Sequence, residues 1–141
     1  MPQRLGDRGK HTIVLQAPDA AWGIRKVARS FSRRVEGLEI RADRGLTCNV
    51  RVSCLQVFVG RFDHDCGEVG RRWYGCASIG TDPGVIWLDT STSALTRRNK
   101  ACHELGHALG LRHHEHRGCV GEGFLERPSA YEVRVLDAVF R

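Results

Sequence analysis

Three histidines and a glutamate in the second half of the chain constrain its fold and chemistry more than any other feature. His103 and His107 are four residues apart, so a helix would project both from one face, where two imidazole nitrogens can bind one metal ion. Glu104 would lie beside that ion. Gly110 can adopt the left-handed conformation that ends a helix, which would return His113 as a third ligand. Three protein ligands leave one position open for water, as in catalytic zinc sites.

Two alternatives for this segment stay open. The first is an ordinary amphipathic helix with the histidines on its polar surface and four apolar residues in the core: Leu105, Ala108, Leu109 and Leu111. The full pattern is far rarer by chance than the short motif HExxH alone, which favours the metal site. The second alternative is that His114 or His116 takes the third ligand position. Only His113 has the spacing that the turn at Gly110 serves, so we expect the other two to be solvated loop residues.

The eleven residues HELGHALGLRH at 103–113 resemble the long zinc signature HExxHxxGxxH of the metzincin metallopeptidases. The resemblance implies an α+β fold: a mixed twisted sheet with an antiparallel edge strand, a backing helix, a zinc-motif helix and a C-terminal helix. The small bacterial snapalysin-like members are comparable in length. The family has a methionine in the turn beneath the metal, whereas the only methionine here is Met1. Another apolar side chain within 118–125 must take its place.

These residues predict a zinc-dependent endopeptidase with one catalytic zinc ion on His103, His107 and His113. The zinc would lower the pKa of its bound water and polarise a peptide carbonyl, and Glu104 would act as the general base. By resemblance to metzincins, a protein or peptide substrate would pair its backbone with an edge strand. That strand would contain Gly75, Cys76, Ala77 and Ser78. Tyr74 and Tyr131 are candidates for a hydrogen bond to the oxyanion, but each is more often a packed tyrosine.

Two other functions compete with this prediction. One is a catalytically silent zinc-binding or interaction domain, against which Glu104 argues, because a purely structural site needs no base beside the metal. The other is a nucleic-acid-associated zinc protease, which only the basic charge balance supports.

Composition predicts one domain over residues 1–141 and a monomer. With 41% hydrophobic residues, the chain can bury one core. It has no apolar run long enough to span a bilayer, so we expect no membrane association. Residues 1–10 are polar and basic with no apolar segment behind them, so we expect no secretory signal in this sequence. The localisation stays open, because the six cysteines are compatible with an extracellular site.

The net charge of +6 comes from 22 basic and 16 acidic residues. Many of the basic residues share a predicted helix with apolar residues spaced three, four and seven apart, which is typical of an amphipathic helix. The basic members are Arg25, Lys26, Arg29, Arg33 and Arg34. They are most simply a solvated helix face. Binding to nucleic acid or to acidic partners is the alternative, but no recognised nucleic-acid motif accompanies them.

The cysteines are compatible with disulfides or with free thiols. The favoured pair is Cys102 with Cys119, which would tie the zinc helix to the loop below the metal. Cys66 with Cys76 is the next choice. If residues 48–54 form one strand, Cys48 and Cys54 lie roughly 20 Å apart and cannot bond to each other.

The apolar pattern predicts five strands and three helices. Strands are expected at 11–16, 38–42, 50–62, 73–79 and 85–88, and the strand at 50–62 should be central and covered on both faces. Asp19 should cap the basic helix, which runs to about Val35, and residues 90–93 should cap the zinc helix. An amphipathic helix should close the chain over 129–140.

Overall fold

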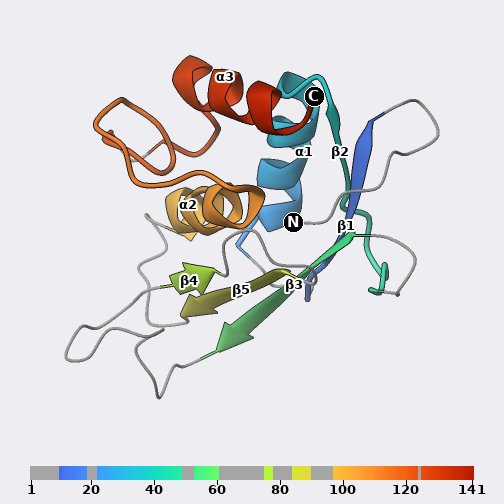
Figure 1. The fold of residues 1–141 in the computed structure, drawn as a ribbon. Coiled ribbons are helices and arrows are strands. Elements are labelled where there is room, and N and C mark those ends of the chain that lie inside the picture. Colours follow the sequence, from blue (N-terminus) through green and yellow to red (C-terminus); the bar gives the residue numbers. More distant parts are fainter. Residues whose placement is uncertain are drawn as a thin grey trace.

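A five-stranded sheet with helices against it forms the framework of the protein, seen in a computed structural model (Figure 1). The structure describes residues 10–18, 22–48, 53–60, 75–77, 84–89, 97–123 and 125–141. In chain order the elements are β1 (His11–Gln16), α1 (Ile24–Arg34), β2 (Leu38–Arg41), β3 (Ser53–Gly60), β4 (Gly75–Ala77), β5 (Gly84–Asp89), α2 (Arg97–Leu109) and α3 (Ala130–Val139).

The sheet has the strand order β2-β1-β3-β5-β4. The strands β2, β1, β3 and β5 are parallel to one another, and the three-residue β4 pairs antiparallel with β5 at the edge. The parallel β1-α1-β2 unit interleaves strand and helix, as in α/β proteins. The expected α+β class, in which helices and strands are segregated, therefore does not describe this half of the molecule.

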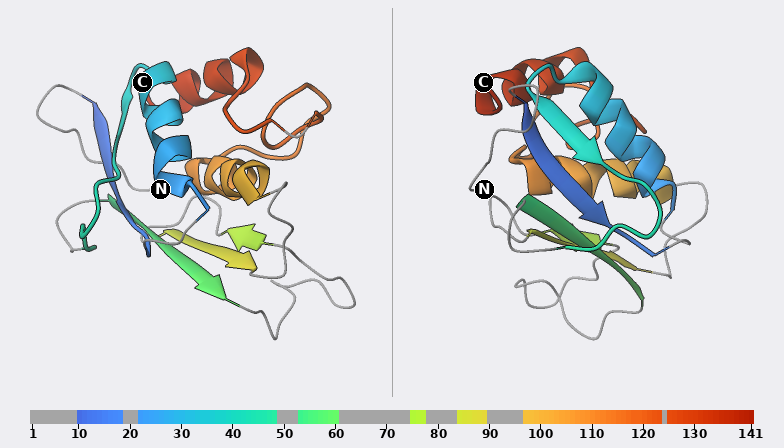
Figure 2. Two further views of the ribbon diagram at one scale, coloured as in Figure 1. Left: turned by 180° about the vertical axis from the view of Figure 1, so that it is seen from behind. Right: turned by 90° about the vertical axis from the view of Figure 1, so that its right-hand side faces the viewer.

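The hydrophobic core lies between the sheet and the helices. The three helices lie above β3, β5 and β4 in the view of Figure 1, and Figure 2 shows the same arrangement from two other sides. The helix α1 contributes its apolar stripe at spacings of three, four and seven, with Ile24, Val27, Ala28 and Phe31 all buried. Alternate residues of the sheet, such as Leu55 and Ile86, meet this layer and are fully buried.

The strand β3 is central, as expected, but its two faces differ. Leu55 and Val57 are buried in the core, whereas Phe58 on the other face is 41% exposed. Phe58 stacks on its cross-strand partner Trp87, with ring centroids 4.7 Å apart. Since the helices cover one face only, the expectation that both faces are covered is wrong.

Two sequence-based expectations about the first half of the chain are also wrong. The helix α1 begins at Ile24 with Gly23 as its N-cap, so Asp19 is not the cap. Cys48 and Cys54 form a disulfide, with their Cα atoms 5.6 Å apart. The expectation that they cannot bond assumed one strand from residue 48, but β3 begins at Ser53. The proposed cap of α2 at 90–93 lies outside the described residues.

In the described part of the chain, no helix is long and apolar enough to cross a membrane. The helix α3 begins with a capping box. The Ser129 side chain accepts a hydrogen bond from the backbone of Glu132, and the Glu132 carboxylate accepts one from the backbone of Ser129. This cap places Glu132 in the interior, where it is fully buried beside the loop that follows α2.

Candidate metal centre

The C-terminal end of α2 turns the chain as the sequence predicts. Gly110 has a φ of 118°, a backbone conformation that side-chain-bearing residues rarely adopt. The Leu111 N–H donates to the Gly106 carbonyl (2.9 Å), and the Gly110 N–H donates to the His107 carbonyl (3.0 Å). These two bonds form a Schellman motif, which ends the helix and satisfies its last carbonyls. The chain then runs back past the helix toward His113.

The imidazoles of His103, His107 and His113 converge. Their Nε2 atoms lie 3.1 Å apart for His107 and His103, 3.1 Å apart for His107 and His113, and 3.2 Å apart for His113 and His103. Three nitrogens at this separation share a point roughly 2 Å from each, which is the length of a zinc–nitrogen bond. These three histidines therefore lie close enough together to bind one metal ion.

Two of the three rings are held by hydrogen bonds to backbone carbonyls. The Nδ1 atom of His103 lies 3.0 Å from the Cys119 carbonyl, and that of His107 lies 2.8 Å from the Leu111 carbonyl. A carbonyl can only accept, so each Nδ1 must carry the proton. The Nε2 lone pairs then point into the cluster, as metal ligation requires.

Burial favours the neutral form of these rings. It lowers the pKa of His103 to about 4, with a further lowering from His107 and an opposing effect of the bond to the Cys119 carbonyl. Burial also lowers the pKa of His107, against the opposing bond to the Leu111 carbonyl. Neutral imidazole is the form that binds a metal ion, so the site is prepared for one at neutral pH.

Glu104 lies beside the histidine cluster, with its Oε1 atom 4.0 Å from Nε2 of His103. It is only 5% exposed and makes no hydrogen bond within the described part of the chain. Burial raises the pKa of Glu104 to about 8, against a smaller opposing effect of Lys100. A carboxyl group with a pKa near neutrality can both take up and release a proton.

The loop after α2 is bound to the helix by a second disulfide. Cys102 and Cys119 are bonded, with their Cα atoms 5.4 Å apart, which confirms the favoured pairing. Cys119 and Val120, two apolar residues of this loop, are buried. A Cβ on Gly106 would lie 2.6 Å from Val120 Cγ2, so the loop approaches the helix closely at this glycine. Val120 is thus packed against the helix that carries the histidines.

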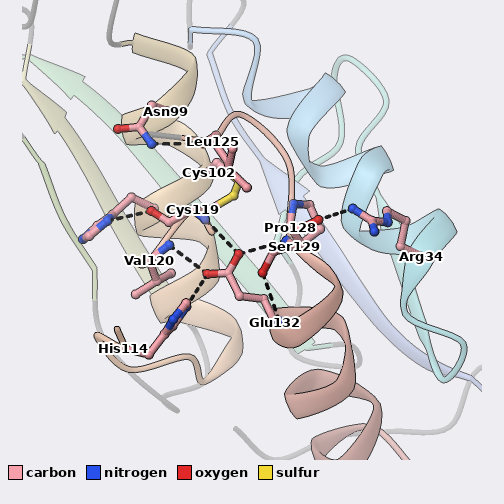
Figure 3. Close-up of a disulfide and its surroundings, with 11 residues drawn as sticks. Arg34, Asn99, Cys102, His114, Cys119, Val120, Leu125, Pro128, Ser129 and Glu132 are labelled. Atoms are coloured by element: carbon pink, nitrogen blue, oxygen red, sulfur yellow. Dashed lines mark hydrogen bonds and ion pairs between the residues drawn. A yellow bond between two sulfur atoms is a disulfide. The ribbon is translucent and has the colours of Figure 1, made fainter. Parts of the chain in front are cut away.

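Glu132 is the second buried carboxylate of this region, and the sequence analysis did not identify it. Its Oε1 accepts from the backbone of Cys119 (2.8 Å) and Ser129 (3.0 Å), and its Oε2 accepts from the backbone of Val120 (2.8 Å) and from His114 Nε2 (2.8 Å) (Figure 3). Burial acts to raise the pKa of Glu132, but these four bonds outweigh it and lower the pKa. The carboxylate therefore holds the loop whose Cys119 carbonyl orients His103.

Two signals in the sequence point to this arrangement. The pattern Ser129-x-x-Glu132 is that of a capping box. Gly118 and Gly121 flank the buried pair of loop residues, and a Cβ on either would collide, with the Glu132 carboxylate or with the His114 ring respectively. Glycines at both ends of a short loop signal a close approach of another group.

The two surplus histidines differ. The side chain of His114 is only 9% exposed and is bound to Glu132, so the expectation that it is solvated is wrong. Because His114 Nδ1 accepts from the His116 backbone (3.2 Å), its Nε2 carries the proton that it donates to Glu132. His116 is exposed and stacks on Tyr131, with ring centroids 3.9 Å apart. Neither belongs to the cluster of three.

Of the expected substrate-binding residues, Gly75, Cys76 and Ala77 form the edge strand β4, which packs against α2. Ser78, Tyr74 and Cys66 lie outside the described residues. Tyr131 contacts the rings of His114 and His116, which is the ordinary packing role.

Comparison with known proteins adds no assignment. No protein-family model matches the chain, and no curated protein matches it.

Proposed function

We propose that this protein is a zinc-dependent endopeptidase of the metzincin type, with Glu104 as its general base. The observation that carries the proposal is the convergence of the three Nε2 atoms, 3.1 to 3.2 Å apart, with a buried carboxyl group beside them. Three nitrogen ligands with an open fourth position are typical of catalytic zinc, whereas structural zinc sites are closed by four protein ligands.

A zinc ion bound by His103, His107 and His113 would supply Lewis acidity, both toward a water molecule and toward the carbonyl of a peptide bond. Glu104 would take the proton of the attacking water and deliver it to the nitrogen of the leaving amine. Its buried carboxyl group lies beside His103, where this proton transfer would take place.

The position of the edge strand β4 favours a peptide as the substrate in this proposal. It is the last strand of the sheet and packs against α2, the helix that carries Glu104. An extended peptide can add to such an edge through backbone hydrogen bonds. In this proposal the substrate pairs with Gly75, Cys76 and Ala77 of β4, and the two small residues Gly75 and Ala77 allow a close approach.

The metal content of the purified protein, measured together with hydrolysis of a generic protein substrate, tests the proposal. We expect about one zinc per chain and cleavage that a chelator abolishes and added zinc restores. His107→Ala should lose the metal and the activity, whereas His116→Ala, outside the cluster, should retain both. Zinc bound at full stoichiometry without any hydrolysis would instead identify a silent metal-binding domain.

A further inference from the structure

A groove on α1 lies outside the histidine cluster. Its volume is about 810 Å³, which is within the range of ligand sites. It lies between one side of α1, the start of α2 and the segment that precedes α3. Its lining residues are Gly23, Lys26, Val27, Ser30, Arg33, Arg34, Arg98, Leu125, Glu126 and Arg127.

The groove is separate from the histidine cluster. None of the three histidines lines it. Arg98 and His107 are nine residues apart on α2, which is about two and a half turns, so they face opposite sides of the helix. A ligand in the groove would therefore lie behind the metal centre rather than in it.

The lining is strongly positive. Five of the ten lining residues are cationic and exposed, and the only acidic one is Glu126. Arg98 lies 3.9 Å from Glu126, an exposed pair of little energetic value. Arg34 donates to the Pro128 carbonyl, which fixes its side chain without neutralising its charge. The groove thus keeps an uncompensated positive charge, which attracts anionic ligands.

The length and lining of the groove favour a peptide over a nucleic acid. From Gly23 to Arg34 the helix advances about 16 Å, which equals roughly five residues of extended chain. The partly exposed Leu125 offers aliphatic surface beside the cations. Among the described residues that line the groove none is aromatic, whereas binding of single-stranded nucleic acid depends on stacking of bases on aromatic rings. We propose that this groove binds an acidic peptide segment of a partner protein.

The test is fluorescence anisotropy of the full chain with labelled hexaglutamate as the probe. Hexaglutamine and the oligonucleotide dT6 serve as comparison probes. We expect hexaglutamate to bind more tightly than either and to weaken as the salt concentration rises. The triple variant Lys26→Glu, Arg33→Glu, Arg127→Glu should weaken binding at least about tenfold.

The matched control is the triple variant Arg29→Glu, Arg112→Glu, Arg134→Glu, which changes the net charge equally at exposed positions outside the groove. It should retain most of the hexaglutamate binding. An equal loss of affinity in both triple variants, equal binding of hexaglutamine, or tighter binding of dT6 would each overturn the proposal.

If the triple groove variant does not fold, the double variant Lys26→Gln, Arg33→Gln replaces it, in which neutral residues take the place of two cations. Its affinity for hexaglutamate should fall about threefold or more. The zinc content of the groove variants should match that of the parent, because the groove and the histidine cluster face opposite sides of α2.

Discussion

The carboxyl groups of Glu104 and Glu132 are both buried near the histidine cluster, yet burial affects their proton affinities in opposite ways. Glu104 makes no hydrogen bond within the described residues, and desolvation raises its pKa to about 8. Glu132 accepts four hydrogen bonds, which outweigh its desolvation and lower its pKa. Burial alone therefore does not determine the charge of a carboxyl group. The hydrogen-bond donors around the carboxyl group decide its charge as well. Without donors Glu104 is suited to proton transfer, whereas Glu132 with its four donors is suited to holding structure.

The largest expected effect concerns activity at Glu104. Glu104→Gln removes the proposed base and leaves the three histidines in place, so the rate of the proposed peptide hydrolysis should fall by about 10²- to 10⁴-fold. Zinc content and fold should stay as in the parent. Single-turnover hydrolysis with metal analysis of the same sample measures both. A variant that cleaves as fast as the parent would show that Glu104 is not the base.

The next effect concerns stability at Glu132. Glu132→Ala leaves two buried backbone N–H groups, one partly buried N–H group and His114 without their acceptor, which should lower the free energy of unfolding by about 3 kcal/mol or more. Zinc affinity should also fall, because the Cys119 carbonyl would no longer hold His103 in place. Denaturant unfolding measures the first, and competition with a chromophoric chelator measures the second. The control is Glu115→Ala, an exposed glutamate of the same loop, which should change neither quantity. If the unfolding and chelator-competition curves of the two variants are similar, Glu132 does not hold the loop that orients His103.

The third effect is a difference in pH dependence in protein stripped of metal. Because the pKa of Glu104 is raised from 4.5, its contribution to stability is full below 4.5 and is lost as the pH rises toward 8. Because the pKa of Glu132 is lowered from 4.5, its contribution is present above 4.5 and is lost as the pH falls through the folded value. Between pH 5 and 8, Glu104→Gln should therefore gain stability relative to the parent, by on the order of 2 kcal/mol. Denaturant unfolding at both pH values checks this, and a constant difference between the proteins would contradict the assigned shift.

The smallest effect separates the two surplus histidines. His114→Ala removes one of the four bonds to Glu132 and should cost about 1 kcal/mol, whereas His116→Ala should cost less than about 0.5 kcal/mol because the ring is exposed. Thermal unfolding of the two variants side by side is sufficient. An equal cost would mean that the bond from His114 contributes nothing beyond packing.

Much of the metal centre could be predicted because its determinants are local. The spacing of His103 and His107 requires only the period of a helix, and the return of His113 requires only a glycine at the turn. The position of β3 in the middle of the sheet likewise followed from its apolar run.

The features that were missed depend on contacts between distant segments. The Cys48–Cys54 disulfide depends on where β3 begins, and the limits of a strand are poorly marked in a sequence. Glu132 could be read as part of a helix cap, but its bonds to Cys119 and Val120 cross 12 to 13 residues and appear only when α3 packs against the loop. The burial of His114 has the same origin.

The disulfide between Cys102 and Cys119 also has a topological consequence. The two cysteines bracket His103, His107 and His113, so all three ligands lie within one covalent ring that persists when the chain unfolds. An oxidised unfolded chain keeps the three imidazoles at a high effective concentration around any metal ion that it meets. Metal ions should then bind this closed unfolded chain more tightly than an open unfolded chain that has the same three histidines and no free thiols. Binding of zinc to the unfolded state offsets its binding to the folded state. Zinc should therefore raise the melting temperature of the oxidised protein less than that of a protein with the same ligands whose unfolded chain is open.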